Sequence, residues 1–404
     1  MTVRLLAGVH RGGPALSYAE HLDVHGPLPA TTGHDLIELA AAGGLRGRGG
    51  AGFPVARKMR TTAGARKKAV VIANASEGEP ASHKDRTLLN GNPHLTLDGL
   101  QLAARAVGAT DAAIGVHRGG LRGLLRDALK QRKDPVKVKV VEVPDRYVSG
   151  EAGALTSSVA GSKGLPTDRN LPLAESGLKG RPTLVQNAET LADLAVLARM
   201  GAERYREVGT DEEPGTILVT LAGVREPQVL EVEIGTPIRE ALALGGGTAA
   251  PLQAVLVGGY YGAWLPAALA VDVPLSHAGL RAAGGSLGAG LVVALSDQRC
   301  GIAAASKVAT YLAGQSARQC GPCLNGLPAL AGGMEQLARG TGTETTLADV
   351  ERWCGMVLGR GACSHPDGAA SMVRSAIKVF SDDVALHLSG GCGRPAGDEL
   401  GVPA

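Results

Sequence analysis

Two cysteines, Cys320 and Cys323, lie three residues apart in the segment QCGPC. Of all the residues in the chain, they are the clearest candidates for a chemical role. A C-x-x-C pair serves as a redox dithiol, as half of a zinc site, or as part of an iron–sulfur site. A thioredoxin-like dithiol is disfavoured because no βαβ pattern surrounds the pair. The residues alone leave the zinc and iron–sulfur interpretations open.

A glycine-rich loop, GLRGRGGAGFP at residues 44–54, is the second segment that could have a chemical role. It contains G-x-G-x-x-G, but a helical segment (34–42) precedes it where the dinucleotide fingerprint requires a strand. Closely spaced glycines let a backbone approach a ligand and turn its N–H groups toward an anion. Positive charge lies beside them, on Arg46, Arg48 and Lys58. The loop therefore predicts an anion site, or a flexible surface loop in a glycine-rich chain.

Regular elements must position these groups, and an α/β pattern begins near residue 68. Short β-branched runs predict strands at 68–74, 112–117 and 136–144. Helical patterns follow at 92–109, 121–131 and 150–161. Alternating strands and helices indicate a parallel sheet, in which ligands bind beyond the carboxyl ends of the strands. Here those ends are residues 74–80, 117–119 and 147–151.

The pattern changes after the linker at 209–215. Strand, strand, helix and strand follow at 216–223, 229–235, 236–246 and 253–259, which is a β-grasp-like order. From about residue 300 only amphipathic helices are expected, and they carry the cysteines. We therefore predict three domains: an α/β domain with a Rossmann-like parallel sheet (1–208), a β-grasp domain (209–283) and a helical domain (284–404).

Bulk composition excludes several classes of protein. Lys+Arg 41 against Asp+Glu 38 gives a net charge of +3, too small for a dedicated nucleic-acid binder. No run approaches the ~18 apolar residues of a membrane span, and we expect no secretory signal. Six cysteines without a secretory route indicate reduced thiols in the cytoplasm. Five histidines have no ligand spacing and are expected as surface or capping residues: His10, His21, His25, His34 and His94.

Four long motifs carry a family resemblance: GLRGRGGAGFPVARKM (44–59), NASEGEPASHKDR (74–86), YVSGEAGAL (147–155) and GRPTLVQNAETLA (180–192). They resemble motifs of the flavin-bearing, NADH-oxidising F-type (51 kDa) subunit of respiratory complex I and of related soluble hydrogenase and formate dehydrogenase subunits. The middle segment resembles that family's soluble-ligand-binding β-grasp domain, and QCGPC with Cys363 resembles its iron–sulfur bundle. The resemblance covers essentially the whole chain in the same order, and the chain is identified as a diverged member.

The resemblance implies an FMN site on the α/β domain. The residues that it places around the flavin and its phosphate are Gly47, Arg48, Gly49, Gly50, Ala51, Lys58, Asn74, Ser76, Glu77, Tyr147, Gly150, Glu151, Asn187 and Thr190. Phe53, one of only two phenylalanines, would stack on the dinucleotide, and Glu79 would be the catalytic carboxylate on the nicotinamide side. FMN suits the loop because a dianionic phosphate pairs well with backbone N–H groups and a lysine.

The resemblance also implies a 4Fe–4S cluster, with Cys320, Cys323 and Cys363 as ligands. Ala317 occupies the position of the first family cysteine, so the cluster is incomplete, or takes water, Ser316, His365 or Cys392 as its fourth ligand. Zinc held by the three cysteines and His365 is an alternative. Cys300 and Cys354 are expected as small core residues. Ser76 and Ala152 also depart from the family, where carboxylates stand.

The function implied is an NADH dehydrogenase-like oxidoreductase. It would accept a hydride from NADH on FMN and pass electrons through the iron–sulfur cluster to a quinone or a ferredoxin-type chain. Its expected partners are NAD(H) and other electron-transfer subunits, such as a thioredoxin-like iron–sulfur subunit or a ferredoxin, with no nucleic acid. Peripheral association with a membrane complex is compatible with this. The alternative is a diverged electron-relay or assembly subunit that keeps the fold but does not oxidise NADH.

Overall fold

The computed structural model describes residues 3–117, 119, 121–167 and 172–403, so the predicted strand end at 117–119 includes one residue, 118, outside the described part. The chain forms two compact units. The first contains Met1–Gly78, His83–Leu218 and Glu231–Gly235, and the second contains Glu79–Ser82, Val219–Leu230 and Thr236–Ala404. The three-domain boundaries at 208 and 283 stay predictions.

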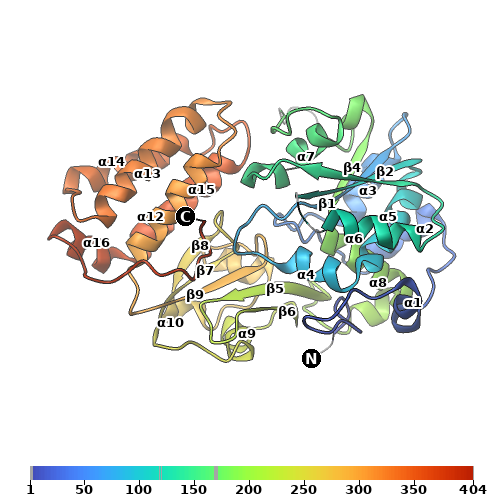
Figure 1. The fold of residues 1–404 in the computed structure, drawn as a ribbon, viewed down its shortest axis with the longest axis horizontal. Helices are drawn as coiled ribbons and strands as arrows, with labels where there is room; N and C mark the ends of the chain where they lie inside the picture. Colours follow the sequence, from blue (N-terminus) through green and yellow to red (C-terminus); the bar gives the residue numbers. More distant parts are fainter. Residues whose placement is uncertain (1–2, 118, 120, 168–171, 404) are drawn as a thin grey trace. The chain divides into compact units, whose positions relative to one another are not determined.

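A four-stranded parallel sheet lies at the centre of the first unit, in the order β3-β2-β1-β4. Figure 1 labels strands β1, β2 and β4 of this sheet. Its strands are β1 (Val70–Ala75), β2 (Asp111–His117), β3 (Val138–Val143) and β4 (Thr183–Asn187). The first three confirm the predicted strands. The fourth lies inside the 180–192 motif, which was not predicted as a strand.

Helices surround this sheet in the first unit. They are α1 (Tyr18–His25), α2 (Gly33–Ala42), α3 (Val55–Ala63), α4 (Lys84–Gly91), α5 (Pro93–Val107), α6 (Leu121–Lys130), α7 (Ala152–Val159) and α8 (Ala188–Tyr205), with short turns η1 (Tyr147–Gly150) and η2 (Leu178–Gly180). Helix α5 begins where predicted, because the Asn92 side chain accepts the N–H of Leu95 and Pro93 follows. It packs against α8 with almost no gap: a Cβ on Gly99 would lie 1.8 Å from the Leu191 carbonyl oxygen.

The second sheet is mixed, in the order β6-β5-β9-β7-β8, and most of it belongs to the second unit. Its strands are β5 (Thr216–Ala222), β6 (Gln228–Glu233), β7 (Leu252–Val257), β8 (Ala263–Pro266) and β9 (Leu291–Ser296), with helices α9 (Ile238–Leu244), α10 (Ala267–Ala270) and α11 (His277–Ala282). Strand β9 pairs with both β5 and β7, so this sheet extends past the expected boundary at 283.

The N-terminal segment of the first unit is held by one carboxylate of β6. Glu231 accepts the backbone N–H groups of Arg4 at 2.9 Å, Leu5 at 2.9 Å and Leu6 at 3.0 Å. The Thr216 hydroxyl donates to the same carboxylate at 2.6 Å. Glu231 is buried, so these donors replace the water that its charge would otherwise need.

Helices dominate the rest of the second unit, as predicted. They are α12 (Gly301–Gly314), α13 (Leu327–Ala338), α14 (Glu344–Val357), α15 (His365–Val379) and α16 (Ser381–Leu388), with a π-helical segment η3 (Pro322–Gly326) before α13. The parallel sheet, the mixed sheet and the helical end confirm the predicted fold class. None of the helices in the described residues is long and apolar enough to cross a membrane.

Candidate functional site

Two loops that follow strands β1 and β3 touch through their backbones. The Asn74 side chain donates from Nδ2 to the Gly150 carbonyl oxygen at 2.9 Å. A Cβ on Gly150 would lie 2.8 Å from the Ser76 carbonyl oxygen, and a Cβ on Gly78 would lie 2.7 Å from that of Tyr147. Only glycine fits at such a distance without a shift of the backbone. The structure thus brings the predicted residues of both loops together at the carboxyl edge of the sheet.

Ser76 is tied to this edge rather than free to bind a ligand through its hydroxyl proton. Its Oγ donates to Asn74 Oδ1 at 2.6 Å, and its N–H donates to the same oxygen at 3.2 Å. A neutral hydroxyl therefore stands where the family resemblance expects a carboxylate. The loop keeps its shape without that negative charge.

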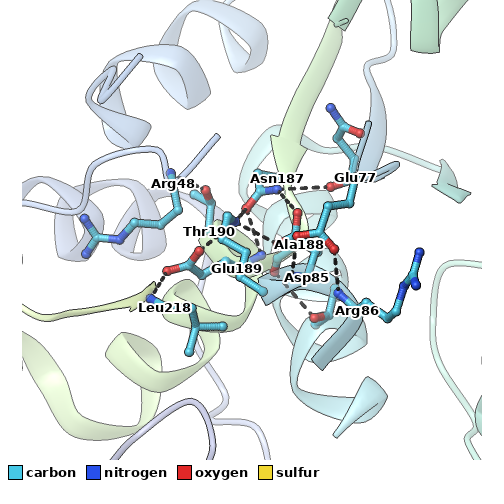
Figure 2. A network of polar contacts seen from close by, with 12 residues as sticks. Arg48, Glu77, Asp85, Arg86, Asn187, Ala188, Glu189, Thr190 and Leu218 are labelled. Carbon is cyan, nitrogen blue, oxygen red and sulfur yellow. Dashed lines mark hydrogen bonds and ion pairs between the residues drawn. The ribbon is translucent and has the colours of Figure 1, made fainter. Parts of the chain in front are cut away.

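Asn187, at the end of β4, is central to a buried polar network (Figure 2). Its Nδ2 donates to Asp85 Oδ2 at 2.7 Å, and its Oδ1 accepts the Glu189 N–H at 3.0 Å, so it caps α8. Lys84 Nζ lies 2.9 Å from Asp85 Oδ1 and 2.7 Å from Glu189 Oε2. Burial opposes the charge of Lys84, but the two carboxylates raise its pKa above the ordinary value. The network fixes the first turns of α4 and α8.

Glu77 also serves this network (Figure 2). Its carboxylate accepts the N–H groups of Asp85 at 3.3 Å and Arg86 at 3.2 Å, in the first turn of α4. The carboxylate is well placed against the positive end of the helix dipole. Lys84, Asp85 and Glu189 were missed as site residues, although adjacent opposite charges next to the 74–80 strand end were a usable signal.

The glycine loop is a tight hairpin whose two sides meet at Arg46 and Pro54. The Gly47 N–H donates to the Phe53 carbonyl oxygen at 3.0 Å. Gly50 and Gly52 have φ values of 117° and 60°, which favour glycine. None of the described residues accepts a hydrogen bond from the N–H groups of Gly49, Gly50 or Ala51. The tip of the hairpin therefore offers backbone donors to a ligand.

Arg48 anchors this hairpin to α8. Its N–H donates to Thr190 Oγ1 at 2.8 Å, and its Nε lies 2.9 Å from Asp193 Oδ2. Its guanidinium also donates to the Tyr205 hydroxyl at 3.3 Å. The side chain is only 2% exposed, so its charge is paired with the buried Asp193 carboxylate and does not face solvent. Arg48 and Thr190, both predicted as cofactor contacts, therefore join the hairpin to α8 by a hydrogen bond and an ion pair.

Lys58, on α3, has a different environment. Its Nζ donates to the Val185 carbonyl oxygen at 2.6 Å, and burial lowers the pKa of Lys58 to about 8. No ion pair joins Lys58 to a carboxylate among the described residues. A partly buried ammonium without a counter-charge is suited to an anionic ligand.

Three further predicted residues lie close to these elements. Phe53 is 45% exposed, with the Arg57 guanidinium 5.6 Å from its ring centroid. Tyr147 lies in η1 and Glu151 is the N-cap residue of α7; both are partly buried. The ring of Phe53 is therefore not part of the core, and its exposed face is accessible for stacking.

Glu79 belongs to the second unit. It is 7% exposed, and its Oε2 accepts the Tyr260 N–H at 2.8 Å. A Cβ on Gly259 would lie 2.5 Å from the same oxygen, so the turn after β7 fits closely around the carboxylate. This hydrogen bond orients Glu79.

The three predicted cluster ligands gather at the π-helical segment. Cys320 Sγ lies 3.6 Å from Cys323 Sγ. The pKa of Cys320 is lowered, since backbone N–H groups of Ala362 and Cys323 outweigh the effect of burial. Cys363 adds negative charge near Cys323, whose pKa burial and its neighbours raise to about 11. The loop that carries Cys363 is thus adjacent to the C-x-x-C pair.

The candidates for a fourth ligand differ in their contacts. His365 is engaged at both ring nitrogens, by the Tyr261 hydroxyl at 2.5 Å and the Leu312 carbonyl oxygen at 2.7 Å, which disfavours it as a metal ligand. Cys392 lies instead beside His387. Ser316 has a buried Oγ without a hydrogen-bond partner among the described residues. Arg318, after Ala317, has a φ of 56°, a left-handed conformation that suits glycine better.

Comparisons with known proteins agree with this arrangement. The family profile described as Nuo51 FMN-binding domain matches residues 40–196, and that described as NADH-ubiquinone oxidoreductase-F iron-sulfur binding region matches residues 303–387. The second NADH-quinone oxidoreductase F subunit of Rhizobium meliloti (strain 1021) is 29% identical over 382 residues, 88% of this chain and 89% of the relative. The corresponding F subunit of Mycobacterium tuberculosis (strain ATCC 25618 / H37Rv) is 31% identical over 391 residues, 88% of this chain and 85% of the relative.

Among solved structures, the NAD+-reducing NiFe hydrogenase in the H2-reduced state has a similar chain, with a TM-score of 0.82 and 28% identity. The match covers 88% of this chain and 63% of the hydrogenase chain, so this chain spans under two thirds of that neighbour. The two bacterial relatives are matched over most of their length. From its sequence, its fold and the arrangement of its site, the chain belongs to the family of NADH-quinone oxidoreductase F subunits.

Proposed function

We propose that the protein is an NADH dehydrogenase-like oxidoreductase that accepts a hydride from NADH on FMN and passes electrons through an iron–sulfur cluster to a partner acceptor. Membership of the family supports this, together with a flavin-domain match and an iron–sulfur match in the same chain. When bound, FMN supplies two-electron acceptance and one-electron release, which no side chain of the protein can perform.

The glycine hairpin carries this proposal. The N–H groups of Gly49, Gly50 and Ala51 are not used by the described residues, and Lys58 lacks a carboxylate partner. These groups fit a dianionic phosphate, since backbone donors and an ammonium are the usual partners of such an anion. Arg48 and Thr190 hold the hairpin in place, while Asn74 and Gly150 shape the edge of the sheet. Phe53 would offer its exposed ring to the dinucleotide.

The cysteines fit an iron–sulfur cluster at three of its four positions. Cys320, Cys323 and Cys363 would supply thiolates, and Ala317 cannot supply the fourth. Ser316 is the neighbouring candidate, because its buried hydroxyl has no partner among the described residues. Other electron-transfer subunits would receive the electrons, with a thioredoxin-like iron–sulfur subunit or a ferredoxin as the proposed class. Six free thiols favour a reducing compartment, and we propose the cytoplasm.

Replacing Lys58 tests the phosphate site. Lys58→Ala removes one charge-assisted hydrogen bond, worth about 1.5–3 kcal/mol, and should weaken FMN binding roughly 10- to 100-fold. FMN affinity is measured by quenching of flavin fluorescence with the apoprotein. Arg60→Ala is the matched control, because Arg60 lies on the same helix and pairs with exposed Glu38. Equal affinities for wild type and Lys58→Ala would contradict the site.

A second candidate function is an electron-relay or assembly subunit that does not oxidise NADH. The neutral residues Ser76, Ala152 and Ala317, at positions where the family resemblance expects carboxylates and a cysteine, favour it. Anaerobic titration of FMN-loaded protein with NADH separates the two functions, since rapid bleaching of the flavin absorbance is expected only of the oxidoreductase. In the same assay Glu79→Gln should slow bleaching while FMN stays bound. An unchanged rate would remove Glu79 from the reaction.

A further inference from the structure

A second group of metal-binding side chains lies in the second unit, separate from the cysteines of the predicted cluster. Cys300 is the N-cap residue of α12, His387 lies on α16, and Cys392 follows in the C-terminal segment. His387 Nε2 is 3.1 Å from the Sγ of Cys300 and 3.1 Å from the Sγ of Cys392. All three ligand atoms lie within 4.8 Å of one another. Among the described residues, no other group of three such side chains is as compact.

The ligand types indicate the metal. Two sulfurs and one imidazole nitrogen are the donors that zinc prefers, at bond lengths of about 2.3 Å for sulfur and about 2.0–2.1 Å for nitrogen. A tetrahedral ion with those bonds separates its sulfur and nitrogen ligands by about 3.5 Å. The observed separations need to widen by only a few tenths of an ångström. The arrangement is therefore a near-complete site for a zinc-sized ion.

Burial raises the pKa of the Cys300 thiol, so the metal ion itself must displace that proton. Local donors and charges assist the thiolates. The Ala303 N–H donates to Cys300 Sγ at 3.3 Å, and the positive end of the α12 dipole lies behind it. Asp383 accepts the Gly301 N–H at 2.8 Å and pairs with Arg394, whose charge stands two residues from Cys392. Cys300 and His387 are buried and Cys392 is half-buried, so one side is left for water or an exchangeable ligand.

The site also has a structural purpose. The described residues after α16, 389–403, form no helix or strand, yet they run back to α12 and to the end of β9. The Cys300 N–H donates to the Pro395 carbonyl oxygen at 2.8 Å, and Arg394 donates to the Asp297 carbonyl oxygen at 3.0 Å. A metal bond to Cys392 would fix the start of this segment, where hydrogen bonds alone would have to hold it.

We propose that Cys300, His387 and Cys392 bind one zinc ion, which ties the C-terminal segment to the first turn of α12. Binding replaces the two thiol protons, which are released to solvent, and a water molecule completes the tetrahedron. The site requires neither FMN nor the iron–sulfur cluster. Failure of the zinc site and failure of the proposed oxidoreductase function are therefore distinguishable.

Metal analysis of the full-length protein is the first test. Protein purified anaerobically without added metal should contain about one zinc per chain, and Cys392→Ser and His387→Gln should each lose it. Cys354→Ala is the control, because Cys354 is a buried cysteine of the same unit that is not part of this group. FMN binding and far-ultraviolet circular dichroism show whether each variant is folded. Zinc retained by folded Cys392→Ser protein would overturn the proposal.

Cobalt provides a test that does not depend on those variants. The triple variant Cys320→Ser/Cys323→Ser/Cys363→Ser removes the other thiol cluster, and Co²⁺ is titrated into this protein after zinc is removed. A thiolate-to-cobalt charge-transfer band and the visible bands of a tetrahedral ion are expected, saturating at about one equivalent. Their absence would overturn the proposal. So would a Cys300–Cys392 disulfide, found by mass spectrometry of unreduced peptides from the anaerobic protein.

Discussion

The protonation of Lys58 should control how the protein binds FMN. Burial lowers its pKa to about 8, and no carboxylate among the described residues forms an ion pair with it. A phosphate dianion binds the charged form, so FMN affinity should be highest between about pH 6 and 7, above the second pKa of the phosphate, and should decline as pH rises through about 8. The apparent Kd at a series of pH values measures this. Lys58→Arg keeps its charge throughout and should flatten the profile; a wild-type profile that is already flat would contradict the role of Lys58.

Arg48 should matter for stability more than for contact with the cofactor. Arg48→Met leaves the Asp193 carboxylate buried without its ion-pair partner, which costs about 3–5 kcal/mol of unfolding free energy. Denaturant unfolding of the apoprotein measures the loss. The exposed Arg60–Glu38 pair gives the comparison, since Arg60→Ala should cost at most about 1 kcal/mol. Similar losses for both variants would show that Arg48 is not the anchor of the hairpin.

These residues also show where sequence reasoning stopped. Glycines and positive charges indicated an anion site, but the pattern GLRGRGG does not tell which arginine turns inward. The interior positions of Asp193 and Tyr205 decide that, and they lie on a helix more than a hundred residues away. Cys300 is buried, as predicted. Its contacts with His387 and Cys392 were not predicted, since these residues are remote in sequence.

At the scale of elements, the contact between the β1 and β3 loops should be required for the flavin site. Gly150→Ala places a Cβ 2.8 Å from the Ser76 carbonyl oxygen, so one loop must move and the edge of the sheet must open. FMN affinity should fall at least roughly tenfold, which corresponds to about 1.4 kcal/mol. Isothermal titration with FMN measures this.

The control is Gly123→Ala, in the first turn of α6. Nothing lies within 4 Å of a Cβ at that position, so the change should leave FMN affinity unaltered. It should also stabilise the helix by about 0.5–1 kcal/mol. If Gly150→Ala behaves like Gly123→Ala, the two loops are not held by close backbone contact.

Helix α5 was predicted from the sequence, whereas strand β4 and the helix α8 that follows it were not. Helix α5 has a cap, a proline and four turns of apolar periodicity, and it was found within two residues of its predicted ends. Strand β4 has only five residues and leads directly into α8, so its alternation is too brief to register. Strand β9 was placed outside the β-grasp segment because a long connection separates it from β7 and β8.

At the scale of the molecule, buried histidines should make the first unit sensitive to acid. His21 and His94 are 0% exposed, so the prediction of surface or capping roles was wrong for them. Burial lowers the pKa of His94 and of partly buried His25 from 6.5 to about 4. The unfolded chain therefore binds more protons between about pH 6.5 and 4, and stability should fall as pH drops through that window.

Thermal unfolding of the apoprotein across this range checks the expectation. His94→Phe, which cannot be protonated, should reduce the slope of Tm against pH. Exposed His34→Phe, on the same unit, should not. A slope that His94→Phe leaves unchanged would assign the acid sensitivity to other groups.

The hydrogen bonds between Glu231 and the N-terminal segment have a consequence for synthesis of the chain. The chain leaves the first unit after Leu218 and returns to it at Glu231–Gly235. A nascent chain of 208 residues therefore lacks Glu231, the carboxylate that accepts the backbone N–H groups of the N-terminal segment. The hydrogen bonds that hold the N-terminal segment can therefore form only after translation has reached β6. The first residues to be synthesised are among the last of this unit to gain their native contacts.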